Sequence, residues 1–215
     1  MKIVAVNGSP KTDGISALII KRMEKLLDQQ METYHAIRLV RAETPQKDLA
    51  VMLEADILLI VFPLFVDSLP SPLIELLTRL ESIAHHGVTI PRIFTIVNGA
   101  FDSTQTAIAL EMIEHFTCRA GALWGYGIGI GAGSMLYNAG EDWENGIASD
   151  IHHALCNMAT AIKEKRSGQN IYVAPKFPRF LYKIAANVSF WRKAKKNGVN
   201  NLRTRPYLNQ SGNQR

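Results

Sequence analysis

The chain has 215 residues, 47% of them hydrophobic, which suits one α/β domain of ordinary size and is too apolar for a disordered protein. The net charge of +5 is unevenly spread, because residues 163–215 carry 13 of the 24 Lys and Arg but only one of the 19 acids. The body is therefore acidic and the C-terminal segment strongly basic. The strongest apolar run, residues 57–66, is about half a membrane span, so no transmembrane helix is expected.

Two features bear on location and redox state. Met1 and Lys2 lead directly into an apolar run, so no charged segment precedes a signal-peptide core. Cys118 and Cys156 are the only cysteines, and they are far apart without CxxC spacing. This usage favours a reducing compartment and argues against a four-cysteine cluster or zinc site. We expect a cytoplasmic protein.

Strand and helix patterns alternate five times along the first 166 residues. Short β-branched or apolar runs predict strands, and apolar positions at helical spacing predict helices. In chain order the patterns predict a strand at 2–8, a helix at 15–31, a strand at 34–40, a helix at 49–54, a strand at 56–62, a helix at 71–83, a strand at 93–97, a helix at 103–116 with Ser103 as N-cap, a strand at 122–130, and a last helix with Trp143, Ile147, Ile151, Leu155, Met158 and Ile162 on one face.

This alternation predicts a parallel sheet with right-handed crossovers and helices on both faces. For five strands we expect the flavodoxin-like order 2-1-3-4-5, a three-layer α/β sandwich formed by residues 1–166. Residues 167–215 would form a basic C-terminal extension with an amphipathic helix. Ligands of such sheets bind outside the carboxyl ends of the strands, where the strand order reverses. The loops at 8–16, 63–70 and 98–103 should therefore form the site.

The first of these loops has the features of a phosphate cradle. It reads NGSPKTDGIS from Asn7 and joins the first strand to the first helix, whose N–H groups and partial positive charge suit a phosphate. It lacks GxxxxGK[ST] and GxGxxG, so neither a nucleoside triphosphate nor a dinucleotide along this helix is expected. The alternative is an ordinary βα loop with a serine cap. The residues that suit a phosphate are the hydroxyls of Ser9, Thr12 and Ser16, the charge of Lys11, and the glycines Gly8 and Gly14.

The second and third loops could form a slot for a flat ring. Phe65 can pack on a planar apolar ring, and Pro63 and Pro70 stiffen its loop. In the loop that begins with Asn98, Gly99 would let backbone N–H groups approach the ring. Each loop alone could be a plain turn. Three such loops at neighbouring strand ends favour a binding site.

The first loop resembles the FMN phosphate loop of the NAD(P)H-dependent FMN reductase and flavodoxin-like oxidoreductase family, in Asn7-Gly8-Ser9-Pro10-Lys11 followed by Gly14 and Ser16. The second loop matches the family in Pro63, Leu64, Phe65 and Pro70, although members often have Tyr where this chain has Phe65. The resemblance spans about residues 1–166 in element order. It implies that FMN is held by Ser9, Lys11, Gly14, Ile15 and Ser16 at the phosphate and by Pro63, Leu64, Phe65, Val66, Asn98, Gly99, Ala100 and Phe101 at the ring.

The resemblance also implies a reaction. NADH or NADPH would reduce the bound FMN, and a flavin, quinone, nitro compound or protein would then accept the electrons. The cofactor carries this chemistry, so we predict no catalytic side chain. Family members commonly form homodimers, which we expect here. The alternative is a flavodoxin-type electron carrier without small-molecule turnover, and a third possibility is a flavin-free module that binds a partner.

Other motifs are given a structural interpretation. Residues 127–132 formally fit GxGxxA but lie at the end of the sheet, so we read them as a strand that admits close neighbours. The pairs His85-His86 and His152-His153 point to different sides of a helix and predict no metal site. The related iron–sulfur flavoproteins carry a compact cysteine cluster, and no cysteine lies between residues 41 and 56.

The basic segment contains an amphipathic pattern between Lys176 and Lys196. Nucleic-acid binding is disfavoured, because the aromatics lie within the apolar stripe rather than among the charges. A membrane-surface helix fits the composition. Docking of the stripe on the acidic body or on a second subunit is the third interpretation, and the one the charge balance favours. The stripe consists of Phe177, Phe180, Leu181, Ile184, Val188 and Trp191.

Overall fold

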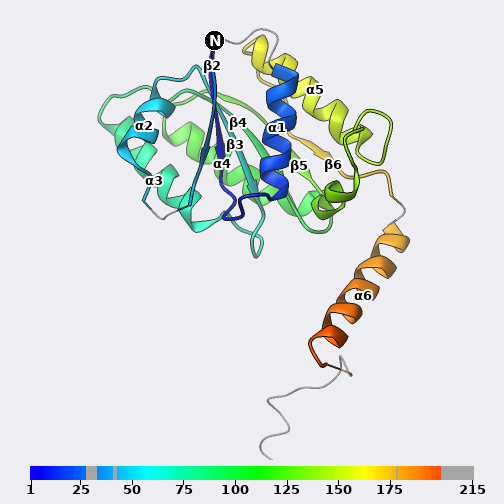
Figure 1. The fold of residues 1–215 in the computed structure, drawn as a ribbon. Helices are drawn as coiled ribbons and strands as arrows, with labels where there is room; N and C mark the ends of the chain where they lie inside the picture. Colours follow the sequence, from blue (N-terminus) through cyan, green and yellow to red (C-terminus); the bar gives the residue numbers. More distant parts are fainter. Residues whose placement is uncertain (28–32, 41–42, 178, 200–215) are drawn as a thin grey trace, which may run out of the picture. The chain divides into compact units, whose positions relative to one another are not determined.

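In the computed structural model a six-stranded parallel sheet is the centre of the first of two compact units, Met1–Lys176 (Figure 1). The structure describes residues 1–27, 33–40, 43–177 and 179–199. The sheet order is β2-β1-β3-β4-β5-β6, so the predicted order 2-1-3-4-5 is confirmed and extended by one strand. The strands are β1 (Lys2–Asn7), β2 (Thr33–Arg38), β3 (Ile57–Pro63), β4 (Arg92–Asn98), β5 (Trp124–Ile130) and β6 (Ile171–Val173).

The sixth strand corrects the predicted five-stranded sheet. β6 has three residues and pairs with β5 in parallel, with Ile128 opposite Ile171. Three residues are too few to give an alternating pattern, which is why the sequence did not reveal the strand. The chain divides into two compact units between Lys176 and Phe177, and β6 lies in the first of them.

Helices cover both faces of the sheet, which makes the sandwich three layers deep (Figure 1). α1 and α5 pack on one face, and α2, α3 and α4 on the other. The bounds are α1 (Ile15–Leu27), α2 (Gln46–Leu53), α3 (Ser71–His85), α4 (Ala107–Arg119) and α5 (Ser149–Lys163), with short 3₁₀ helices η2 (Ser103–Thr106) and η3 (Gly133–Asn138). The second unit contains α6 (Arg179–Lys196). None of the helices in the described part of the chain is long and apolar enough to cross a bilayer.

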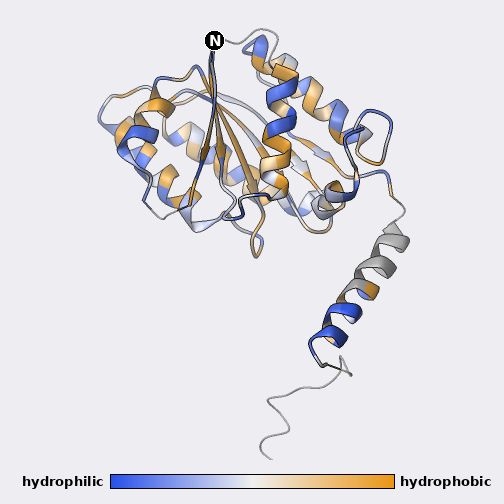
Figure 2. Cartoon of the chain, viewed as in Figure 1, coloured by the Kyte–Doolittle hydropathy of each residue, from blue (hydrophilic) through white to orange (hydrophobic). Residues whose placement is uncertain are grey.

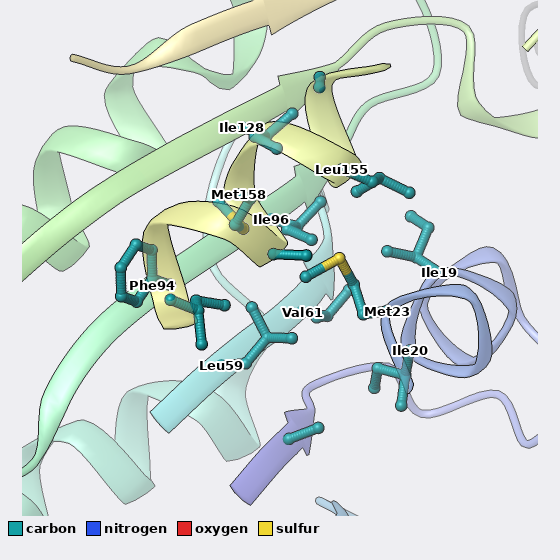
Figure 3. Close-up of a cluster of buried hydrophobic side chains, with 14 of the residues drawn as sticks. Ile19, Ile20, Met23, Leu59, Val61, Phe94, Ile96, Ile128, Leu155 and Met158 are labelled. Atoms are coloured by element: carbon teal, nitrogen blue, oxygen red, sulfur yellow. The ribbon is translucent and has the colours of Figure 1, made fainter. Parts of the chain in front are cut away.

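Strand alternation divides the buried side chains between two cores. Along β3, Leu59 and Val61 face α1 and α5, whereas Ile60 on the same strand faces the opposite helices. Figure 3 shows the first core, where Met23 of α1 and Met158 of α5 meet the side chains of the sheet. Each fully buried side chain of this size contributes about 1.5–3 kcal/mol, so these cores hold the strands and their end loops in place.

The structure corrects the predicted roles of Ser103 and Trp143 near the starts of two helices. Asp102, not Ser103, caps the segment before α4, because its side chain accepts a hydrogen bond from the Thr104 N–H and a 3₁₀ turn precedes the α-helix. The last helix of the sandwich begins at Ser149, so Trp143 lies in the preceding loop. Trp143 is nevertheless 2% exposed, because the loop folds its ring onto the core.

The amino ends of the strands are joined by ion pairs. The Asp56 carboxylate accepts hydrogen bonds from the Lys2 N–H and the Lys165 ammonium, each at 2.8 Å. The Lys2 ammonium lies 2.7 Å from a carboxylate oxygen of Glu54. These contacts connect β1, the start of β3 and the chain after α5 at one edge of the sheet. The opposite, carboxyl edge carries the predicted site.

Candidate functional site

The first loop closes tightly against the sheet before α1 begins. The Gly8 N–H donates to the Val61 carbonyl at 2.9 Å, and a Cβ atom at Gly8 would lie 2.8 Å from the Cβ of Phe62, so only glycine fits there. The Asn7 side chain accepts from the Ser9 N–H, and the Ser9 hydroxyl accepts from the Lys11 N–H at 3.2 Å. The buried Ser9 therefore shapes the turn, while the Lys11 side chain is exposed beside the start of α1.

Asn98 connects this loop to the rest of the site. Its side-chain amide donates to the Ser16 hydroxyl and to the Phe62 carbonyl, both at 3.0 Å. Asn98 is 8% exposed and Ser16 is 1% exposed. The Ser16 hydroxyl, which the sequence analysis expects at a phosphate, accepts a hydrogen bond from Asn98 and is buried in this structure. These two side chains fix the ends of β3 and β4 against the first turn of α1.

The second loop is a tight hairpin that projects from the carboxyl edge. Phe65 and Ser68 exchange two backbone hydrogen bonds, of 3.0 and 2.9 Å. Val66 and Asp67 between them have φ values of 48° and 55°, as in a type I′ turn. Phe65 is 43% exposed and Val66 is 98% exposed. A β-branched residue in the left-handed region is strained, so the hairpin holds an apolar side chain in solvent at a cost.

The third loop begins in register with the sheet. The Gly99 N–H donates to the Ile130 carbonyl at 2.7 Å, so this N–H continues the pairing of β4 with β5. The sequence shows a glycine after a strand, but it does not show which carbonyl accepts the hydrogen bond from the glycine N–H. Ala100 and Phe101 follow at the surface, with Phe101 58% exposed. The loop thus presents an aromatic side chain at the edge that also carries the hairpin.

Each predicted site residue can now be placed. Gly14, Ile15 and Ser16 are buried at the start of α1, and Gly14 packs so closely that a Cβ atom would lie 3.2 Å from the Ser9 hydroxyl. The second loop is joined to the third by a 2.9 Å hydrogen bond from the Leu64 N–H to the Asn98 carbonyl. The structure thus brings the three loops together at one edge. The exposed members of the set are Lys11, Phe65, Val66, Ala100 and Phe101, and the partly or fully buried ones are Ser9, Gly14, Ile15, Ser16, Pro63, Leu64, Asn98 and Gly99.

Sequence reasoning missed a fourth contributor, the segment after β5. The Ala132 N–H donates to the Phe101 carbonyl at 2.6 Å, and Ala132 has a φ of 46°. Further along, the Tyr137 hydroxyl donates to the Asp13 carbonyl in the first loop, at 3.3 Å. The glycine-rich run after residue 125 was the available signal, because close backbone approach next to a sheet edge needs small residues.

Arg38 was missed as well. It ends β2, and its guanidinium donates to the Thr12 hydroxyl at 2.8 Å, which adds a second positive charge beside Lys11. Arg38 also lines a cavity of about 260 Å³ between β2 and α2. Among the described residues that line this cavity, the positive charges of Arg38 and Lys47 are offset by the negative charges of Glu43 and Asp48. Their net charge therefore does not favour a phosphate there.

Comparison with solved structures identifies the fold. The chain resembles an NAD(P)H:quinone oxidoreductase from Methanothermobacter marburgensis, with 13% identity, a TM-score of 0.58, and coverage of 75% of this chain and 96% of that one. It also resembles an NADH:FMN oxidoreductase (EMOB) in its apo form, with 16% identity, a TM-score of 0.56, and coverage of 77% and 90%. A flavodoxin from Streptococcus pneumonia TIGR4 matches with 14% identity, a TM-score of 0.54, and coverage of 76% and 99%.

The sequence matches no family model and no curated protein. At 13–16% identity these three likenesses show the fold and not the activity. The matched structures include two oxidoreductases and a flavodoxin, so a choice of function depends on the site.

Proposed function

We propose that this protein, which has the flavodoxin-like fold, binds FMN at the carboxyl edge of its sheet and is an NAD(P)H-dependent oxidoreductase. The observation that carries the proposal is the linkage made by Asn98. Its side-chain amide donates hydrogen bonds to Ser16 at the start of α1 and to Phe62 at the end of β3. Its backbone carbonyl accepts a hydrogen bond from the Leu64 N–H in the second loop. One buried side chain thereby fixes a helix N-terminus, which suits a phosphate, beside two loops with exposed aromatics.

The fit to FMN follows from what each part offers. The first turn of α1 provides N–H groups without intrahelical partners, and Lys11 and Arg38 add positive charge around the same loop. Phe65 and Phe101 are exposed and can pack on a flat apolar ring. The bound FMN would supply the electron transfer, and the protein would supply its position and its shielding from water.

FMN binding is tested by a charge reversal at the surface of the cradle. Lys11→Glu places a negative charge beside the phosphate, and we expect FMN affinity to fall at least tenfold because one attraction becomes a repulsion. Lys21→Glu, on the exposed face of α1, makes the same change in net charge away from the loop and should leave the affinity unchanged. Equal affinity in the two variants, by fluorescence titration with FMN, would remove the first loop from the site.

Reductase and carrier functions are separated by reduction of the loaded protein. We expect NADH or NADPH alone, without air, to bleach the absorbance of the FMN-loaded protein within seconds. A carrier would be bleached only by a second enzyme. A purified protein that stays colourless and takes up no added FMN would contradict both and favour a module that binds a partner.

We also propose that the protein is a homodimer. In α4, Ile108 is 61% exposed and Met112 is 40% exposed, and their four-residue spacing puts them on one side of the helix. This apolar face lies in the segment that follows the Phe101 loop, so a second subunit seated on it would help to enclose the ring. Sedimentation velocity at micromolar concentration should show a dimer that Ile108→Lys weakens. A monomer at all concentrations contradicts the proposal.

A further inference from the structure

The helix α6 belongs to a separate compact unit and combines exposed apolar side chains with concentrated positive charge. Val188 is 41% exposed, Phe190 61% and Trp191 49%. The last turn carries Lys193, Lys195 and Lys196, next to Arg192. Figure 2 shows this end of α6 as strongly hydrophilic. The stripe positions Phe180, Leu181 and Ile184 lie outside the residues whose side chains the structure describes.

The charge of α6 is unbalanced within the helix. The sequence of residues 179–196 has six basic residues and no acid. Such a helix forms no ion pairs among its own side chains, so its positive charge is available to an anionic partner. The cluster at the C-terminal end also suits the helix dipole, which favours positive charge there.

We propose that α6 binds the surface of an anionic lipid bilayer, with its axis in the headgroup layer. Trp prefers this layer because its apolar ring carries a polar N–H, Phe can insert its apolar ring at the boundary with the acyl chains, and Lys and Arg near the layer are attracted by the lipid charge. The Lys195 ammonium lies 5.0 Å from the centre of the Trp191 ring. Lysine can thus keep its charge at the headgroups while its stem and the Trp ring enter the layer.

The arrangement of the described side chains favours lipid over the two other occupants. At 100° per residue, Val188 and Phe190 point about 160° apart, so docking on a protein surface would bury one and leave the other in water. The headgroup layer accommodates aromatic side chains at the flanks of a helix as well as beneath it. Nucleic acid would need an open ring for base stacking, whereas Lys195 already lies over Trp191.

The test uses the full-length protein and vesicles of phosphatidylcholine with or without 30% phosphatidylglycerol. We expect co-sedimentation with the anionic vesicles only, and a loss of binding at high salt because the attraction is screened. Trp191 emission should shift to the blue on binding, since its ring leaves water. Trp143 is already buried at 2% exposure, and Trp191→Phe should abolish the shift while binding remains.

Matched variants separate this proposal from a general effect of charge. Lys195→Gln with Lys196→Gln should weaken partitioning about 30-fold, at about fivefold per lysine. Lys21→Gln with Lys25→Gln removes the same charge from the exposed face of α1 and should change partitioning little. Equal losses in the two pairs, or binding without any shift of Trp191 emission, would overturn the proposal. So would absence of vesicle binding at low salt, which is the result expected if the helix docks on the protein itself. The test is independent of the flavin, because it needs neither FMN nor turnover.

Discussion

The two edges of the sheet are held in different ways. At the amino edge, the Asp56 carboxylate accepts hydrogen bonds from Lys2 and Lys165, so charged groups connect the neighbouring segments. At the carboxyl edge, backbone hydrogen bonds and the amide of Asn98 make the connections, and aromatic side chains are exposed. Surface ion pairs contribute little to the free energy of unfolding, so substitutions there are tolerated. Loss of a buried amide hydrogen bond or of a close backbone contact costs more.

The difference between the two edges indicates where this molecule can hold a ligand. Ion pairs at the amino edge satisfy the charged groups there by themselves. Lys165 at the amino edge has a positive φ of 50°, but it directly follows the end of α5, where a left-handed residue commonly closes a helix. At the carboxyl edge, the β-branched Val66 is left-handed within a hairpin and Ala132 is left-handed after β5, so the chain retains more strain there. Retained strain next to exposed aromatics is more readily explained by binding than by stability.

The largest effect is expected from Gly131→Ala. A Cβ atom there would lie 2.5 Å from the backbone N of Ser103 and 2.7 Å from the Phe101 carbonyl, and backbone atoms cannot easily move away. We expect a loss of about 3 kcal/mol in the free energy of unfolding, together with weaker FMN binding. The control is Gly87→Ala, where the added Cβ atom meets no atom within 4 Å and the only cost is the positive φ of 85°, with an expected loss of about 1 kcal/mol. Equal losses in urea denaturation would show that the loops are not tightly packed.

The second prediction concerns two polar side chains of β4. Asn98→Ala removes two buried hydrogen bonds and leaves the Phe62 carbonyl without its Asn98 donor, so we expect a loss of about 2 kcal/mol and a lower affinity for FMN. Thr95 lies in the same strand at 0% exposure, and its hydroxyl has no hydrogen-bond partner among the described residues. Thr95→Val should therefore stabilise the protein by about 0.5–1 kcal/mol without changing FMN affinity. A destabilised Thr95→Val variant would reveal a partner for that hydroxyl.

The order of the main elements could be predicted from the sequence because the buried strands are apolar and the helices have one apolar face. Residues 57–62 illustrate this, since nearly every side chain there is buried. The position of the three loops at one edge of the sheet could be predicted from the strand order alone. The directions of polar groups could not be predicted, because they depend on contacts between distant segments. Asn98 and Ser16 are 82 positions apart, and only the folded sheet brings the amide to the hydroxyl. Arg38 and Tyr137 were missed for the same reason.

The third prediction addresses the amino edge. The Lys165 ammonium and the Lys2 backbone N–H hold the pKa of Asp56 below its usual value of 3.8. The stabilisation is therefore present above pH 3.8 and is lost as the pH falls through the lower pKa of the folded state. At neutral pH we expect Asp56→Ala to cost about 1 kcal/mol and to leave FMN affinity unchanged. Exposed Glu75→Ala is the control, with no effect on either. A loss of FMN affinity in Asp56→Ala would remove the functional distinction between the two edges.

The smallest effect is expected at the hairpin, and its sign matters more than its size. Val66 has a φ of 48°, which costs a β-branched residue about 1 kcal/mol and costs Asn much less. Val66→Asn should therefore raise the free energy of unfolding by about 0.5–1 kcal/mol, because the type I′ turn favours Asn. If Val66 is retained for binding, the same variant should bind FMN or the electron acceptor less tightly while being more stable. Val88→Asn, at a position 43% exposed and without positive φ, should gain no stability. A Val66→Asn variant that is more stable and binds equally well would mean that the strain at this edge serves no ligand.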